Sequence, residues 1–177
     1  MALLHDDADG LRFDFDETET GVLRDLLGHV DTLLAGDTLP AAPSLPGATP
    51  APDPALARLL PPAHRDDPRI AGSYRELTEE ALREDKRADI GVVVAGLPLG
   101  AGTAVLEDPD AWLRALNDLR LTLGVELDIT EDSAPPRRVR TQRDLRLTIY
   151  FWLTHLQESL VQTLLAGGGG SADAHRG

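Results

Sequence analysis

The last apolar segment of the chain, Thr141 to Ala166, limits the fold more than any other stretch. Its large apolar residues recur at steps of three and four, the spacing that lines one face of an α-helix. They are Leu145, Ile149, Trp152, Leu153, Leu156, Leu160 and Leu164. A stripe this wide is unstable alone in water and must be covered by other elements. The segment therefore predicts a core helix, and we expect the rest of the chain to cover it.

The sequence also marks both ends of this helix. Thr141 followed by Asp144 has the form of a capping box, with Asp in place of Glu or Gln. The glycines from Gly167 to Gly170 predict the end of the helix. We expect residues 167–177 to form a disordered tail.

A second tryptophan-bearing helix is predicted upstream. Asp108-Pro109 has the form of an N-cap followed by proline at the first helical position, and Gly124 predicts the end. The apolar stripe between them consists of Trp112, Leu113, Leu116, Leu119 and Leu123. Because each of the two helices brings one tryptophan and a leucine stripe, they are predicted to pack against each other.

The first half of the chain carries further helix signals. Asp16 and Glu19 form another capping box, which opens a helix to about Ala35 with Gly36 as its C-cap. Asp53-Pro54 and Asp67-Pro68 predict two short helices. Thr78 is predicted to cap a further helix that ends near Pro98. Its apolar face consists of Leu82, Ile90, Val93, Val94 and Leu97.

Leu11 to Phe15 alternates apolar and polar residues, which is typical of a short half-buried strand. Val125 to Ile129 is its expected partner. The predicted fold is therefore mainly α, a single helical bundle over residues 1–177 with a small two-stranded pairing. Residues 39–54 are predicted to be a proline-rich linker or loop, and residues 131–140 a polar loop.

Composition excludes several functions. The net charge of −13 and the pI near 4.6 oppose nucleic acid and anionic membranes as partners. The chain has no cysteine, so disulfides and thiol chemistry are excluded. The acidic start of the chain lacks a basic region and a long apolar run, and no stretch is apolar enough to span a membrane. We expect a cytoplasmic protein without a cofactor, and a homo-oligomer is compatible with the sequence.

Each of the two tryptophan-bearing helices carries a group of polar residues. Arg114 and Asp118 are spaced as an i,i+4 ion pair, and Asn117 is placed to contact a partner or fix helix register. His155 and Glu158 share one helix face, but a dinuclear metal site usually has Glu before His and needs carboxylates from other helices. No nucleophile turn of the G-x-S-x-G type is present. We therefore expect no catalytic or metal-binding residue, and a metalloenzyme that uses His155 and Glu158 is an alternative.

A basic cluster opens the last helix, where positive charge opposes the helix dipole. It consists of Arg137, Arg138, Arg140, Arg143 and Arg146. Pairing with the acidic first helix or solvation explains it; docking an acidic partner or nucleic acid is the alternative. The candidate partner-binding residues are Asn117, Asp118, Arg120, Arg137, Arg138, Arg140, Arg143, Gln157 and Glu158.

Four segments resemble an actinobacterial family, the domain of unknown function numbered twenty-seventeen. They are FDFDETETGVLRDLL, DPALARLLPPAHRDDPRIAGSYRELTEEAL, WLRALNDLRLTLGVELDI and YFWLTHLQESLVQTLL. The resemblance implies no catalytic residues. It does imply genes encoded beside the adaptor of the Clp protease, and near a metallopeptidase, a ubiquitin-like sulfur carrier and a cysteine synthase.

The expected function is a non-enzymatic protein-binding or regulatory role. By the resemblance alone, the expected partners are Clp-system or sulfur-carrier components. Members of the family are also labelled as transcriptional regulators, and a DNA-binding regulator that uses the arginine cluster is a second alternative.

Overall fold

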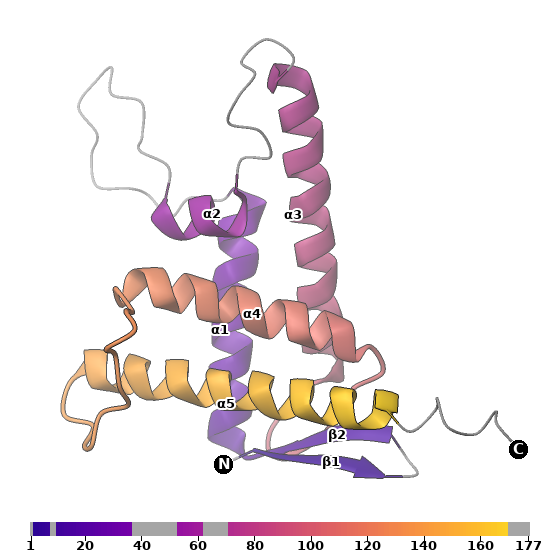
Figure 1. The fold of residues 1–177 in the computed structure, drawn as a ribbon, viewed down its shortest axis with the longest axis vertical. Coiled ribbons are helices and arrows are strands. Elements are labelled where there is room, and N and C mark those ends of the chain that lie inside the picture. The colour runs from indigo at the N-terminus through magenta and orange to yellow at the C-terminus, as the bar shows by residue number, and fades with distance from the viewer. Residues whose placement is uncertain (1, 8–9, 37–52, 62–70, 170–177) are drawn as a thin grey trace, which may run out of the picture.

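The computed structural model describes residues 2–7, 10–36, 53–61 and 71–169, and within them the chain is mainly helical, as predicted (Figure 1). Five helices accompany a three-stranded antiparallel sheet in these ranges. The elements are β1 (Leu3–Asp7), β2 (Gly10–Phe15), α1 (Glu17–Ala35), α2 (Pro54–Leu59), α3 (Ala71–Gly96), β3 (Gly102–Val105), α4 (Pro109–Glu126) and α5 (Gln142–Gly169).

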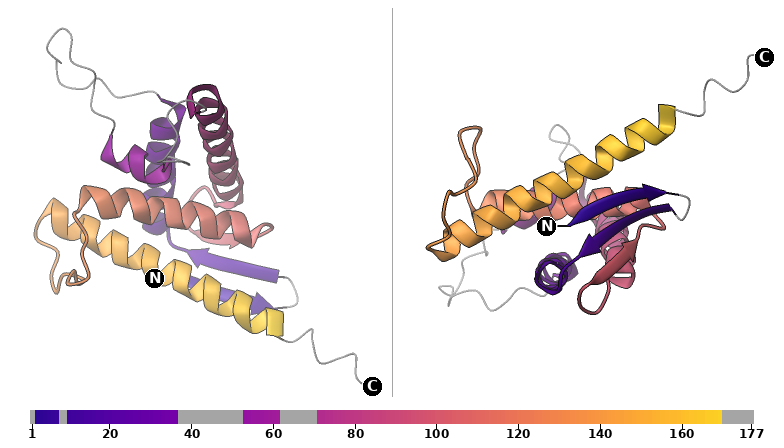
Figure 2. Two further views of the ribbon diagram at one scale, coloured as in Figure 1. Left: turned by 45° about the horizontal axis from the view of Figure 1, so that its top comes forward. Right: turned by 90° about the horizontal axis from the view of Figure 1, so that it is seen from below.

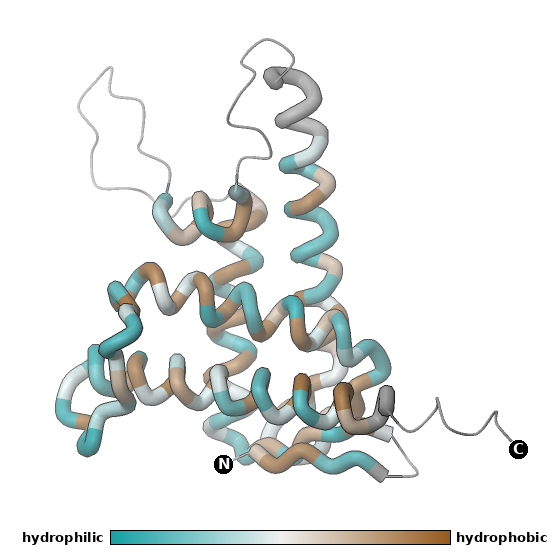
Figure 3. Tube along the Cα trace, in the orientation of Figure 1, coloured by the Kyte–Doolittle hydropathy of each residue, from teal (hydrophilic) through white to brown (hydrophobic). Residues whose placement is uncertain are grey.

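The two tryptophan-bearing helices, α4 and α5, form an antiparallel hairpin. They lie side by side in both views of Figure 2, which confirms the predicted packing. Helices α1 and α3 cross the hairpin steeply on one side, and the sheet lies near the end of the hairpin where α5 finishes (Figure 1). Figure 3 shows hydrophilic residues along the part of α3 that projects beyond α4 and around the connection between α4 and α5.

The sheet confirms the predicted strand but not its partner. Phe13 and Phe15 are buried on one face of β2, as the alternation predicted. Strand β2 pairs with β1 and β3, and the sheet order is β1-β2-β3. The predicted pairing of Leu11–Phe15 with Val125–Ile129 is therefore wrong. The backbone at Val125 completes the last turn of α4, and the Ile129 amide donates to the Gly124 carbonyl at 2.9 Å.

An aromatic cluster joins the sheet to α4. The Trp112 ring stacks on Phe15 with 6.3 Å between centroids, and lies 6.1 Å from Phe13. Gly96, at the end of α3, lies beside the Trp112 ring, and a Cβ at this position would be 3.4 Å from the ring. Trp112 is 1% exposed. It therefore fastens α4 to the sheet, while Leu153, Leu156 and Leu160 bury the inner face of α5.

The capping boxes at Asp16 and Thr141 correctly predicted where α1 and α5 begin. The Asp16 side chain accepts from the Glu19 amide at 2.9 Å, and the Asp16 amide donates to Glu19 at 3.0 Å. Gly36 ends α1 in the left-handed conformation, with φ of 76°. At α5, the Thr141 amide donates to Asp144 at 2.9 Å, and the Asp144 amide donates to the Thr141 hydroxyl at 3.1 Å.

The predicted start of α3 and the predicted end of α4 are wrong. The predicted cap at Thr78 lies inside α3, which runs unbroken from Ala71. The Arg83–Glu79 ion pair, 2.7 Å long, is an i,i+4 contact within this continuous helix. The predicted stop at Gly124 lies inside α4, because the burial of Leu123 and Leu127 around it offsets the cost of one helical glycine, about 1 kcal/mol.

The ends of the predicted linker and tail also differ. Helix α5 continues to Gly169, so the predicted end at Gly167 is too early; adding residues to a formed helix costs little compared with nucleation. Pro54 is the first residue of α2, with Asp53 as its cap. Residues 39–52, the Asp67-Pro68 signal and residues 170–177 lie outside the described residues.

Candidate functional site

Asp118, predicted as a partner contact, is buried between α3 and α4. It is 2% exposed, and its two carboxylate oxygens accept from the Lys86 ammonium at 2.7 and 2.9 Å. The pKa of Asp118 is raised, mainly by burial, although the hydrogen bond and charge of Lys86 lower it. Asp118 cannot therefore offer its carboxylate to a partner in this conformation.

A second ion pair crosses the same helices. The Arg114 guanidinium donates two bonds to the Asp89 carboxylate, at 2.8 and 2.7 Å. Hydrogen bonding to Asp89 raises the pKa of Arg114. The predicted ion pair between Arg114 and Asp118 is wrong, because each side chain reaches across to α3 instead. We call Lys86, Asp89, Arg114 and Asp118 the α3–α4 seam.

A cavity of about 420 Å³ opens at this seam. The half-buried Asn117 lines it, and the side-chain amide of Asn117 forms no hydrogen bond with a described residue. The remaining lining residues are Leu82, Asp85, Lys86, Ala88, Asp89, Arg114 and Asp118. The walls carry both signs of charge, and most of that charge is already paired.

Arg120 and Gln157, both candidate partner residues, are brought together at the contact between α4 and α5. The Arg120 guanidinium donates to Gln157 and, at 3.1 Å, to the Thr154 hydroxyl. It also lies over the Tyr150 ring, 5.7 Å from the centroid. These contacts join the two helices, so Arg120 and Gln157 have a structural role.

The pair proposed for a metalloenzyme lies on the exposed side of α5. His155 and Glu158 are both exposed, and the Ser159 hydroxyl donates to the His155 backbone carbonyl at 2.8 Å. Among the described residues, no group of three His, Cys, Asp or Glu side chains is placed to hold a metal ion. Glu158, also a candidate partner residue, remains accessible.

The arginine cluster divides into two parts. Arg143 donates to the Leu127 carbonyl at 2.7 Å, and Arg146 pairs with Glu126. Both contacts lie at the C-terminal end of α4, whose dipole favours positive charge. The predicted pairing with the first helix is therefore wrong for these two side chains. The first helix does contact Glu126, because Nε2 of His29 lies 3.2 Å from Oε1 of Glu126.

The other three arginines project from the connection between α4 and α5. Arg137, Arg138 and Arg140 are exposed, and their guanidinium groups contact no other described residue through an ion pair or hydrogen bond. We call these three residues the arginine tip. Of the nine candidate residues, the arginine tip and Glu158 are those that offer an exposed, unpaired charged side chain.

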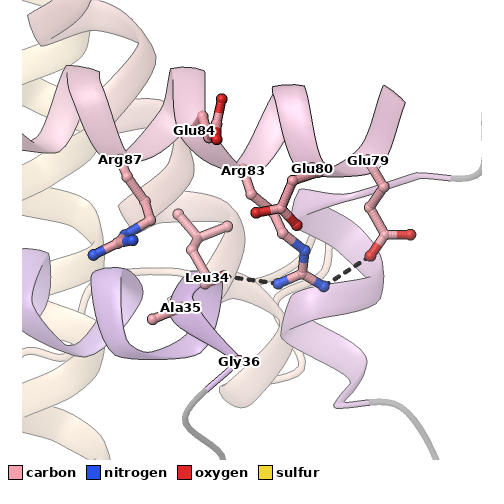
Figure 4. Close-up of a pocket in the computed structure, with 8 residues that line it drawn as sticks. All are labelled: Leu34, Ala35, Gly36, Glu79, Glu80, Arg83, Glu84 and Arg87. Carbon is pink, nitrogen blue, oxygen red and sulfur yellow. Dashed lines mark hydrogen bonds and ion pairs between the residues drawn. The ribbon is translucent and has the colours of Figure 1, made fainter. Parts of the chain in front are cut away.

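A further hollow lies between the end of α1 and α3 (Figure 4). Its volume is about 400 Å³. Arg83 bridges it, donating to the Leu34 carbonyl at 2.8 Å and to Glu79 at 2.7 Å. Arg83 thus satisfies a carbonyl at the C-terminal end of α1, a structural task that explains its position.

Sequence reasoning missed Lys86 and Asp89, which complete the seam. Both lie on α3, more than twenty residues from their partners along the chain. One signal was available, because Lys86 is the single lysine in a chain whose other basic residues are arginines.

The structure defines a helical domain, built on an α-hairpin and a small sheet, with paired charges inside and unpaired arginines at one tip. The chain belongs to the family described as "Domain of unknown function (DUF2017)", which matches residues 1–164. No helix in the described ranges has the length and apolar content needed to cross a bilayer.

The matched relatives carry a functional name. The chain is 37% identical over 130 residues to the "Oxidative stress regulator AosR" of Mycobacterium tuberculosis, and equally to that of Mycobacterium bovis. The match covers 64% of this chain and 59% of each relative, so the chain spans less than two thirds of their length. No solved structure matches the chain.

Proposed function

We propose that this chain is a regulatory protein that acts by binding another protein and performs no chemistry of its own. The proposal is supported by one observation: the buried charged residues are paired, and the unpaired arginines of the tip are exposed. The buried carboxylates Asp118 and Asp89 are paired with cations of the facing helix, whereas the arginine tip is exposed and has no ion pair with a described residue. An active site needs titratable groups in a pocket with free bonding capacity. Here the free charge lies on the surface, where it suits association.

The names of the relatives support a regulatory role connected with oxidative stress. Thiolates are the usual protein sensors of oxidants, and methionine is the other readily oxidised side chain. This chain has no cysteine and one methionine, Met1. Under this proposal the oxidant signal is received by a partner, and this chain changes the partner's activity by binding to it.

The partners implied by the family resemblance are the Clp protease adaptor and the ubiquitin-like sulfur carrier. Each can be purified and tested for binding to the full chain by calorimetry. Saturable binding of either one would identify the partner. If both fail, the Clp and sulfur-carrier part of the proposal is removed, while regulation through another protein stands.

The regulatory proposal is tested by deletion of the gene, followed by hydrogen peroxide challenge. We expect the deletion to change survival, and the full wild-type chain supplied in trans to restore it. The purified chain, treated with the same peroxide, should show no disulfide and no change in its circular dichroism spectrum. Unchanged survival of the deletion strain would contradict the proposal.

A further inference from the structure

The backbone that follows the arginine tip is fixed by contacts at the start of α5. Arg143 is bonded to the Leu127 carbonyl, and the Arg140 amide donates to Asp144 at 3.0 Å. The Thr141–Asp144 capping box fixes the first turn of α5 directly behind it. Less ordering entropy is then lost when a partner binds, because the backbone at Arg140 and in the first turn of α5 is already constrained.

The carboxylates nearest in sequence compensate the charge of the arginine tip only in part. Glu131 and Asp132 belong to the same connection but form no ion pair with it, and Pro135-Pro136 separates the two halves. Between Arg137 and Arg146 the one acidic residue is Asp144, whose pKa is lowered mainly by the hydrogen bonds that it accepts at the helix cap and also by the positive charge of Arg140. Positive charge therefore accumulates at the tip of a chain that carries −13 overall.

Two exposed apolar side chains lie close to the arginines in sequence. Val139, which lies between Arg138 and Arg140, is 54% exposed, and Leu145 in the first turns of α5 is 43% exposed. We call these two residues and the arginine tip the tip surface. Apolar groups beside unpaired guanidinium groups are typical of protein interfaces, in which arginine is enriched and lysine is depleted.

The same features favour a protein over nucleic acid. Nucleic-acid-binding domains usually have a high pI and a broad basic face, whereas this chain has a pI near 4.6. Three arginines would neutralise few phosphates, and the rest of the chain would repel the backbone. The tip surface also has no aromatic side chain on which a base could stack.

We infer that the tip surface binds an acidic segment of a partner protein, with Arg137, Arg138 and Arg140 contacting carboxylates and Val139 and Leu145 contacting apolar side chains between them. The inference rests on the proposed protein-binding function and specifies the chemistry of the partner. It also specifies where on the chain the partner docks, at the end of the α4–α5 hairpin away from the sheet (Figure 1).

The test is a selection from a random peptide display library against the full chain. We expect enrichment of peptides that combine Asp or Glu with Leu, Ile or Phe. Binding of the enriched peptide, measured by fluorescence anisotropy, should weaken about tenfold in the Arg138→Glu variant, and should weaken as salt is raised. The Leu145→Gln variant should weaken binding while leaving the salt dependence unchanged.

The matched control is Arg58→Glu. Arg58 on α2 is also exposed and without a described partner. Because both variants replace Arg by Glu, they change the net charge equally. Equal weakening by both variants would show nonspecific charge attraction and would overturn the inference. Enrichment of neutral or basic peptides, of acidic peptides without apolar residues, or tighter binding of duplex DNA than of the peptide, would also overturn it.

The outcomes separate this inference from the proposed function. If peptides bind but Arg138→Glu has no effect, the tip surface is excluded and protein binding through another surface stands. If the gene deletion leaves the peroxide response unchanged, the regulatory role fails whatever the tip surface binds.

Discussion

The α3–α4 seam and the arginine tip are both rich in charge, yet they differ in what that charge does. At the seam, Asp118 and Asp89 are paired with cations from the facing helix, and Asp118 is 2% exposed. At the tip, Arg137, Arg138 and Arg140 are exposed without a partner in the described chain. A buried charge must be paired for the fold to be stable, whereas an exposed charge contributes little to stability and is free to bind. The two regions should therefore respond oppositely to mutation.

The largest expected effect is at the seam. Asp118→Ala should lower the free energy of unfolding by about 3 kcal/mol, because it leaves the Lys86 ammonium mostly out of water without its partner. Urea denaturation with an unchanged m-value would measure it.

The double variant Lys86→Met with Asp118→Leu is the control for this prediction. It should recover most of the loss, since replacing both members of a buried pair by apolar residues is often neutral. A single Asp118→Ala variant as stable as the wild type would show that the seam is not needed for folding.

A mutation at the base of the arginine tip should lower the free energy of unfolding by an intermediate amount. Thr141→Ala removes the hydroxyl that accepts from the Asp144 amide, and should cost about 1 kcal/mol. Thr148→Ala is a suitable control, because the Thr148 hydroxyl bonds to the Asp144 carbonyl within α5 and does not cap it. Equal losses in the two variants would argue against a special role for the cap.

Asp144 gives this prediction a pH dependence. Its pKa is lowered in the folded state by the amides of Arg140 and Thr141. A carboxylate with a lowered folded pKa adds stability above its unfolded pKa and loses it as the pH falls through the folded value. The difference in unfolding free energy between wild type and Asp144→Asn should therefore shrink in acid. A difference that grows in acid would contradict the assigned hydrogen bonds.

The smallest expected effect is at the arginine tip itself. Replacing Arg137, Arg138 and Arg140 together by Ala should change the free energy of unfolding by less than about 0.5 kcal/mol. The melting temperature, measured by circular dichroism, is sensitive enough to test this. A loss as large as that of Asp118→Ala would mean that the arginines stabilise the fold.

Sequence alone predicted those parts of the molecule that depend on neighbouring residues. The capping boxes at Asp16 and Thr141 each need partners three residues away, so the local pattern is sufficient. The same holds for most of the apolar stripes of α4 and α5, which bury Leu116 and Leu156 as expected. Leu145 is the exception, because it was predicted to belong to the buried stripe of α5 and is 43% exposed.

Parts that depend on distant residues were missed. Strand β3 has four residues, and it forms because Ala104 pairs with Phe13, far away in the chain. Likewise, a rule based on i,i+4 spacing matched Asp118 with Arg114, because it could not anticipate that α3 would bring Lys86 to the carboxylate. The carboxylates of the seam are buried and the tip is exposed, and this difference depends on residues that are distant in the sequence.

The most direct test of the central claim is peroxide survival of the deletion strain carrying the Arg138→Glu variant, with the amount of folded protein checked to equal that of wild type. If the arginine tip is the working surface, this stable variant should leave survival as it is in the deletion strain. Full restoration of wild-type survival by Arg138→Glu would contradict the claim that the unpaired arginines carry the function.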